Sequence, residues 1–190
     1  MNKKRLLEKE AVKIKRCRQC RKDKSGKAVP GEGNAYAKIV FMGEAPGREE
    51  AKVGRPFIGR SGKLLRNLIR QIGLREEDVY ITSPVKYLPA SPTGGPKRPT
   101  PSKSEIIHGT THLTRQLDII NPKIVVLLGN VAYQSLISQS ASINKYHGEV
   151  IEKDRRKYFL TFHPAAAIRF PKIRRLIYQD FAKIKKIMHT

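Results

Sequence analysis

A continuous apolar run, Ile124–Gly129, limits the possible folds of this chain more than any other feature of the sequence. Its branched aliphatic residues show no polar alternation, which is typical of a parallel strand covered on both faces. Shorter apolar segments with the same character lie at Lys38–Met42, Val79–Thr82 and Tyr158–Phe162. Short apolar segments bounded by turn residues favour buried strands. The sequence therefore predicts four strands of one mainly parallel sheet.

Segments with helical spacing of apolar residues lie around these strands. They are Leu6–Lys15, Ser61–Ile72, Glu105–Ile120, Asn130–Ser138 and Ile173–Met188. Strands that alternate with helices form a parallel sheet with helices on both faces. We therefore expect an α/β fold, a three-layer α/β/α sandwich with a central four-stranded, mainly parallel sheet. The segments Ser25–Asn34 and Leu88–Ser104, both rich in glycine or proline, are expected to be loops.

The length of the chain, 190 residues, suits a single domain with a sizeable core. We expect one domain over residues 1–190, in which residues 1–34 form a basic N-terminal leader. This leader contains both cysteines of the chain, Cys17 and Cys20, as a C-x-x-C pair. Two cysteines cannot make the disulfide framework of a small secreted protein, so we expect reducing, intracellular surroundings.

The charge of the chain indicates a polyanionic partner. Lysine and arginine number 39 against 16 acidic residues, which gives a formal net charge of +23. Such a charge favours nucleic acid, because binding releases condensed counterions. An anionic membrane or a ribosome is the alternative. The basic residues are spread along the whole chain rather than beside an amphipathic anchor, and no apolar stretch is long enough to span a membrane. We therefore expect a nucleic-acid partner and no membrane.

Two turns of unusual composition follow predicted strands. The first strand leads into Gly43–Gly47, with the sequence GEAPG, and the last strand leads into His163, the first residue of HPAA. In open parallel sheets, ligands bind at the carboxyl edge of the strands. We therefore expect both turns to line one pocket. The alternative is a tight turn and a hydrogen-bonded histidine, both without chemistry.

The first turn is followed by Gly54–Leu65, GRPFIGRSGKLL, and the second opens His163–Arg169, HPAAAIR. Val79–Thr82 and Pro122–Gly129 lie between these two motifs. All four segments resemble those of family 4 uracil-DNA glycosylases and occur in the same order. The resemblance covers nearly the whole chain from Cys17 onward. The resemblance implies a DNA N-glycosylase, a hydrolase that flips uracil or a related deaminated base out of DNA. Hydrolysis of the N-glycosidic bond would start base excision repair. We also expect a cytoplasmic protein at the nucleoid, and a monomer, which is the default for enzymes that scan DNA.

The resemblance implies roles for individual residues. Phe57 stacks on the uracil. Its position in a flexible loop argues against a place in the hydrophobic core. Backbone amides of Glu44–Gly47 hold a pyrimidine oxygen. His163 donates a hydrogen bond to the departing uracil anion, and Glu44 positions the attacking water or stabilises the cationic sugar. The implied base-binding residues are Gly43, Ala45, Pro46, Gly47, Phe57 and Ser83.

The residues next to these motifs suit contacts with DNA. Basic side chains hold phosphates without reading the base sequence. The chain after His163 would form a wedge that fills the hole in the base stack, with Ile168 as its bulkiest apolar member. The implied DNA-binding residues are Arg55, Arg60, Ser61, Lys63, Ala165, Ile168 and Arg169.

One position bears on the choice of base. The family has an asparagine at the end of the second strand, where its amide reads the N3 and O4 edge of uracil, and here that position is Ser83. A serine hydroxyl is shorter and cannot make the paired contact of an amide, unless Asn67 or Asn130 takes its place. Three functions therefore stay open. They are uracil excision, excision of another lesion such as hypoxanthine, and nucleic-acid binding on a catalytically weak or silent glycosylase scaffold.

The cysteines also depart from the family pattern, in which four of them hold a four-iron four-sulfur cluster. Cys17 and Cys20 match the first pair, but the third and fourth positions are Tyr87 and Gly109. Such clusters require four ligands. The sequence therefore argues against a cluster, and the chemistry itself is expected to need no cofactor.

Two histidines, His108 and His112, lie beside the missing fourth position. If both face Cys17 and Cys20, the set is Cys2His2, which fits a tetrahedral zinc ion. The alternative is that all four are ordinary residues and that packing alone holds the leader. Structural zinc is thus one of two hypotheses for this part of the chain.

Overall fold

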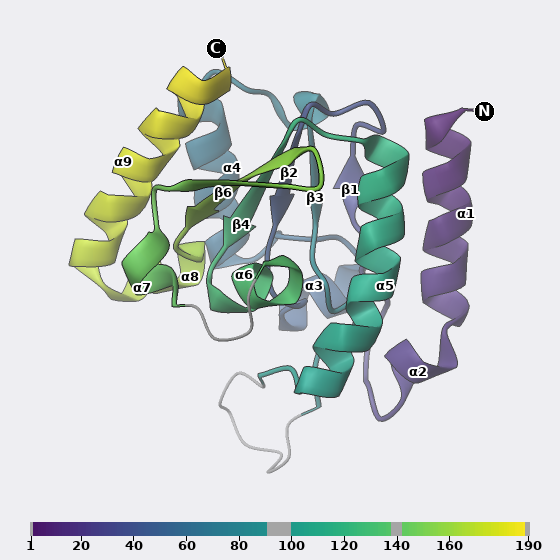
Figure 1. Cartoon of the computed structure of the whole chain (residues 1–190). Helices are drawn as coiled ribbons and strands as arrows, with labels where there is room; N and C mark the ends of the chain where they lie inside the picture. The colour runs from purple at the N-terminus through teal and green to yellow at the C-terminus, as the bar shows by residue number, and fades with distance from the viewer. Residues whose placement is uncertain (1, 91–99, 138–141, 189–190) are drawn as a thin grey trace.

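The computed structural model describes residues 2–90, 100–137 and 142–188 (Figure 1). In this part of the chain six strands form one sheet, in the order β1-β3-β2-β4-β6-β5. The strands are β1 (Glu32–Gly33), β2 (Ile39–Met42), β3 (Val79–Thr82), β4 (Ile124–Leu128), β5 (Val150–Lys153) and β6 (Arg156–Thr161). The inner strands β3, β2, β4 and β6 are parallel, which confirms the four predicted strands and the α/β class.

The two edge strands contradict the expected count of four. β1 pairs antiparallel with β3 inside the segment Ser25–Asn34, for which the sequence predicts a loop, and β5 pairs antiparallel with β6. β1 has only 2 residues, one of them Gly33, and β5 is largely exposed. Neither edge has the continuous apolar run of a strand that is buried on both faces.

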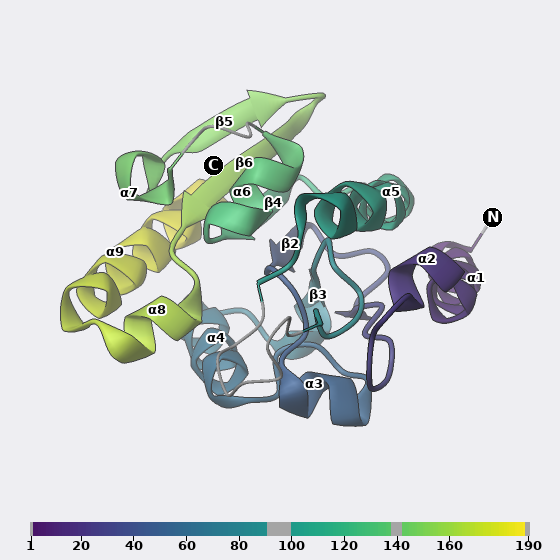
Figure 2. The same ribbon diagram turned by 90° about the horizontal axis from the view of Figure 1, so that it is seen from below.

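Helices cover both faces of the sheet, as expected for a three-layer sandwich (Figure 2). They are α1 (Lys3–Arg16), α2 (Arg18–Arg21), α3 (Arg48–Val53), α4 (Arg60–Gln71), the 3-10 helix η1 (Glu76–Asp78), α5 (Lys103–Ile120), α6 (Asn130–Leu136), α7 (Ile143–Tyr146), α8 (Pro164–Arg169) and α9 (Pro171–Met188). The predicted helices correspond to α1, α4, α5, α6 and α9, while the short α2, α3, α7 and α8 are additional. Two predicted features lie outside the described residues: the helix end at Ser138 and most of the proline-rich loop, residues 91–99.

Alternate residues of the central strands face opposite layers of the core. Val40 and Met42 of β2 belong to the apolar cluster shared with α5 and α6. Ile39 and Phe41 belong to the cluster shared with α4 and α9, where the Phe41 and Phe181 rings stack with centroids 5.8 Å apart. Because both layers are apolar, every residue of β2 is buried. This explains why the strand reads as an unbroken apolar run.

The basic helix α1 packs along α5, outside the layer that α5 forms (Figures 1 and 2). Near its start, Lys3 Nζ donates a hydrogen bond to the carbonyl oxygen of Ile120 at 2.7 Å. Near its end, the Tyr87 hydroxyl donates to the carbonyl oxygen of Lys15 at 3.1 Å. The leader is therefore tied to the rest of the fold at both ends of α1. None of the helices in the described ranges combines the length and the apolar character that a membrane span requires.

Helix α5 approaches the loop after β3 closely at Gly109. A Cβ atom on Gly109 would lie 2.2 Å from the carbonyl oxygen of Pro84. We expect Gly109→Ala to lower the free energy of unfolding by about 1–3 kcal/mol, because the loop and the helix must move apart. Urea denaturation measures this change, and Thr114→Ala on the exposed face of α5 is the control. Equal stability of the two variants would contradict the expectation.

Candidate active site

The carboxyl edge of the sheet carries a cleft of about 700 Å³. Strand register explains its position, because Met42 at the end of β2 pairs with Thr82 of β3, and Leu128 of β4 pairs with Thr161 of β6. The segments that follow these strands therefore leave the sheet at one edge. The predicted site residues that line the cleft are Ala45, Pro46, Gly47, Phe57, Arg60, Ser61, Ser83, His163, Ala165, Ile168 and Arg169.

Four other residues predicted for the base, the sugar or DNA are not among those that line the cleft. They are Gly43, Glu44, Arg55 and Lys63. Glu44 is half-buried in the same turn, and Lys63 is exposed on α4. Arg55 pairs with Glu32 of β1, with Nε 2.7 Å from Oε2 and Nη2 3.1 Å from Oε1. Although burial raises the pKa of Glu32, hydrogen bonds from Arg55 and Arg66 outweigh this effect and hold the pKa below its usual value.

The Phe57 ring forms one wall of the cleft and also belongs to the core. It stacks on the His163 ring, with centroids 5.7 Å apart and 27° between the ring planes. Only 8% of Phe57 is exposed, and it joins the apolar cluster of Leu65 and Leu68. The expectation that its loop keeps Phe57 out of the core is therefore wrong. Its backbone adopts the left-handed conformation, with φ 52°, which few large residues do.

Two glycines leave the space that Phe57 occupies. A Cβ atom on Gly43 would lie 2.5 Å from the Phe57 ring, and one on Gly62 would lie 1.8 Å from the Phe57 carbonyl oxygen. A side chain at either position would therefore displace the loop. Gly43 thus lies against the Phe57 ring and is not itself part of the cleft lining.

Arg66 of α4 holds the Phe57 loop by its backbone. Its Nε donates to the carbonyl oxygen of Phe57 at 3.2 Å, and its Nη2 donates to that of Pro56 at 3.2 Å. The guanidinium is fixed in turn by ion pairs with Glu32, at 2.7 Å, and with Glu76. Sequence reasoning missed Arg66, because in so basic a chain one more arginine on a helix carries no signal.

Glu50 of α3 joins the Gly43–Gly47 turn to the start of α4. Its Oε1 accepts hydrogen bonds from the backbone N–H groups of Ile58, at 3.0 Å, and Gly59, at 2.9 Å. Both donors lie at the N-terminal boundary of α4, because Gly59 is its N-cap residue and Ile58 precedes it. A Cβ atom on Gly47 would lie 2.5 Å from Glu50 Oε2. The buried carboxylate therefore holds the start of α4 as the acidic side chain of a capping box does, by accepting the N-cap N–H.

We expect Glu50→Ala to lower the free energy of unfolding by about 1.5–3 kcal/mol, because two backbone donors lose a charged acceptor. The matched control is Glu49→Ala, which removes an exposed carboxylate next to it and should change stability by less than about 0.5 kcal/mol. Urea denaturation measures both variants. If the Glu50 variant is as stable as the Glu49 variant, Glu50 does not cap α4.

The tautomer of the neutral His163 ring follows from its place at the start of α8. Its Nδ1 accepts a hydrogen bond from the backbone N–H of Ala165 at 3.1 Å, as an N-cap side chain does. The neutral ring therefore carries its proton on Nε2. This atom faces the first turn, since a Cβ atom on Gly43 would lie 3.8 Å from it. His163 thus supplies an N–H donor at this side of the cleft.

The Ser83 side chain lines the cleft, but its proton is already used. The hydroxyl donates to the carbonyl oxygen of Val85 at 2.8 Å, and Ser83 is buried. Its oxygen can therefore only accept a further hydrogen bond. Neither proposed substitute lies in the lining: Asn67 is exposed on α4, and Asn130 Oδ1 accepts from the Ile143 backbone N–H at 2.7 Å.

A buried lysine ties together the segments behind Ser83. Lys86 Nζ donates to Gln116 Oε1 at 2.7 Å, to Thr82 Oγ1 at 2.9 Å and to the carbonyl oxygen of Pro30 at 3.2 Å. Burial lowers the pKa of Lys86 to about 7. These contacts link β3, α5 and the segment before β1. No pattern in the sequence distinguishes Lys86 from the many exposed lysines.

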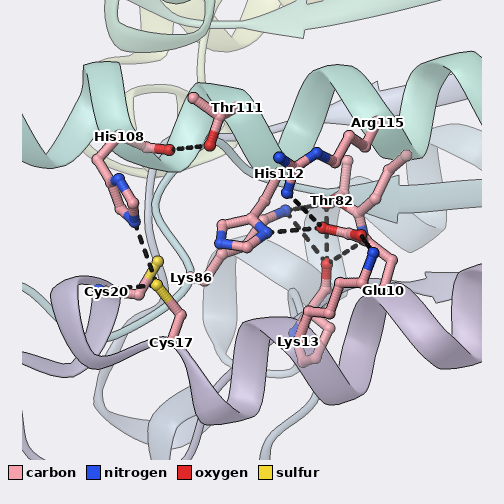
Figure 3. Close-up of polar contacts among 12 residues, drawn as sticks. Glu10, Lys13, Cys17, Cys20, Thr82, Lys86, His108, Thr111, His112 and Arg115 are labelled. Carbon is pink, nitrogen blue, oxygen red and sulfur yellow. Dashed lines mark hydrogen bonds and ion pairs between the residues drawn. The ribbon is translucent and has the colours of Figure 1, made fainter.

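A second group of side chains lies where α1, α2 and α5 meet (Figure 3). The Cys17 Sγ lies 3.2 Å from His108 Nε2. One ligand atom from each of Cys17, Cys20, His108 and His112 lies within 4.8 Å of the other three. The group can therefore hold a metal ion, as the zinc hypothesis requires. Burial raises the pKa of the Cys20 thiol to about 12, and the neighbouring Cys17 adds to this rise.

Known proteins resemble this chain over most of its length. A family model described as the uracil DNA glycosylase superfamily matches residues 30–184. A type-4 uracil-DNA glycosylase from Saccharolobus solfataricus is 39% identical, over 95% of this chain and 85% of the relative. Proteins of the same name from Sulfurisphaera tokodaii and Thermotoga maritima are 40% and 38% identical. They match 97% and 96% of this chain, and 84% and 95% of their own.

Proposed function

Because the chain belongs to the uracil DNA glycosylase superfamily, and within it to the type-4 family, we propose that it excises uracil from DNA by hydrolysing the N-glycosidic bond. This reaction starts base excision repair. The observation that carries the proposal is the stacked pair of Phe57 and His163 at the carboxyl edge of the sheet. An aromatic face next to an N–H donor suits a flat base with a carbonyl oxygen. The base must leave the duplex to reach them.

His163 has the main electrostatic role in this proposal. When the glycosidic bond breaks, negative charge develops on the uracil, and a fixed N–H donor stabilises an oxygen that carries it. The hydrogen bond from Ala165 to Nδ1 supports this role, because it keeps the proton on Nε2. Backbone amides of the Glu44–Gly47 turn would hold a pyrimidine oxygen.

Glu44 is proposed to act on the sugar. A carboxylate there stabilises the oxocarbenium-like sugar or positions the attacking water. Its half-buried place in the turn after β2, beside the cleft, supports this assignment. Together, a donor for the leaving base and a carboxylate for the sugar suffice for hydrolysis. We therefore propose that the chemistry uses no cofactor.

Ser83 is proposed to recognise the base through an acceptor alone. With its proton donated to Val85, the hydroxyl oxygen suits the N3–H of uracil. Cytosine has an acceptor at N3, so the same oxygen disfavours it. The hydroxyl cannot also donate to O4, as an amide would. We therefore expect weaker discrimination between uracil and other bases with an N–H at this edge, hypoxanthine among them.

DNA is proposed to lie across the mouth of the cleft. Arg60 and Arg169 line it and suit phosphates, which position DNA without reading its sequence. Ile168 is 38% exposed at the same edge and is our candidate for the wedge that fills the vacated stack. We propose that the protein acts as a monomer in the cytoplasm, at the nucleoid.

Oligonucleotides that carry uracil, hypoxanthine or xanthine test the proposed function. After incubation with the protein, alkali cleaves the abasic sites that a glycosylase leaves. Strand breaks at uracil support uracil excision, whereas breaks at hypoxanthine alone would assign another substrate. Tight, salt-sensitive binding without abasic product would contradict excision of uracil and of any other tested base. It would favour a catalytically silent protein that binds nucleic acid.

Two substitutions of His163 separate its chemistry from its structural role. His163→Asn keeps a good N-cap for α8 but removes the imidazole donor. We expect uracil excision to fall about 100- to 1,000-fold, with DNA affinity and the free energy of unfolding nearly unchanged. His163→Ala should lose the same activity and also about 1 kcal/mol of stability. An active asparagine variant would show that the donor is not needed.

Substitutions of Ser83 test how the base is read. Ser83→Asn should raise the rate on uracil relative to hypoxanthine roughly tenfold, about the worth of one added hydrogen bond. The control Ser83→Ala removes the acceptor and should lower the rate on uracil. Single-turnover excision on the two substrates measures both effects. An alanine variant as fast as the unchanged protein would show that Ser83 does not contact the base.

A further inference from the structure

The residues present do not fit the iron–sulfur cluster that the family resemblance implies. Such a cluster needs four thiolates, and only Cys17 and Cys20 supply them. At the third position, the Tyr87 hydroxyl donates to a carbonyl at the end of α1 at 3.1 Å. At the fourth, Gly109 has no side chain and no room for one, because a Cβ atom would lie 2.2 Å from a neighbouring carbonyl oxygen. Both positions are engaged in packing instead.

We propose that Cys17, Cys20, His108 and His112 bind a single tetrahedral metal ion, zinc by the chemistry of the donors. Two thiolates with two imidazoles are a common donor set of structural zinc. The four candidate ligand atoms lie within 4.8 Å of one another. Zinc bonds of about 2.0–2.3 Å hold tetrahedral ligand atoms about 3.3–3.8 Å apart. Small side-chain movements therefore close the site around one ion, whereas a four-iron cubane needs far more space.

The local fold directs all four ligands to one point. Cys17 ends α1 and caps α2, and its Sγ accepts the backbone N–H of Cys20 at 3.4 Å, so the turn places both sulfur atoms on one side. His108 and His112 lie one helical turn apart on the same face of α5. Figure 3 shows their rings directed toward the two cysteines.

A buried carboxylate contacts one of the four candidate ligands from behind. Glu10 of α1 is only 3% exposed, and its Oε1 lies 2.6 Å from Nδ1 of His112. The other ring nitrogen of His112 points toward the cysteines (Figure 3). Metal-binding histidines commonly donate their second N–H to a carboxylate, which fixes the ring and strengthens the ligand. Arg115 and Lys13 approach Glu10 from the outside, each at 3.8 Å.

An ion at this point would clamp the leader to the glycosylase fold. It joins the turn between α1 and α2 to α5, which also contacts the loop after β3 at Gly109. The site is separate from the cleft, because none of its four ligands lines the cleft. The metal therefore has a structural role. Its loss should loosen residues 2–22 before it affects the chemistry.

Metal analysis of protein purified without a His tag tests the proposal. Mass spectrometry of the metals should find about one zinc per chain, lost in Cys17→Ser and His112→Ala and kept in the matched controls Gln19→Ser and Thr111→Ala. Cobalt added to the metal-free protein should give the visible bands of a tetrahedral, thiolate-bound ion. Iron with acid-labile sulfide, or no stoichiometric metal after reconstitution with zinc, would overturn the proposal.

Glu10→Gln tests the contact between the Glu10 carboxylate and His112 without changing the shape of the side chain. We expect the affinity for zinc to fall about 10- to 100-fold, measured by competition with a chromophoric chelator. Glu8→Gln, on the exposed side of α1, is the control and should bind zinc normally. Circular dichroism verifies that both variants fold. Equal affinities would remove Glu10 from the site, whatever its effect on stability.

Discussion

The stacked contact between Phe57 and His163 joins segments from opposite parts of the chain, and the cleft depends on it. Phe57 reaches this position because Gly43 leaves room for its ring and Gly62 for its carbonyl group. Arg66 holds the same loop through two backbone carbonyl groups. The positions of the Phe57 ring and the His163 imidazole therefore depend on each other. A change in any of these supports alters both surfaces that a bound base would meet.

The inner strands were predictable because the layers on both of their faces are apolar, and the long helices because their apolar residues recur at helical spacing. Every residue of β2 and β4 is buried, so the sequence there carries no other pattern that could compete. The edge strands β1 and β5 lack such a pattern, since their pairing depends on backbone hydrogen bonds with a neighbour. The short helices α3 and α8 likewise begin directly after turns and lack a helical pattern long enough to predict them. Burial on both faces is thus what makes a strand recognisable in the sequence.

The place of a residue in the cleft was predictable where it directly follows a strand, as His163 does. A role was not predictable where the direction of the side chain decides it. Glu49 and Glu50 are the same residue in adjacent positions, yet one is exposed and the other caps α4. The spacing of His108 and His112 suggested metal ligands, whereas Glu10 became visible only through the packing of α1 on α5.

Gly109 constrains how this chain can evolve. A cysteine at this position would bring its Cβ to 2.2 Å from the carbonyl oxygen of Pro84, so the adjoining loop must move before a fourth thiolate fits. That loop begins at Ser83, in the wall of the cleft. A four-cysteine pattern of the kind that the family resemblance implies would therefore shift the wall of the cleft.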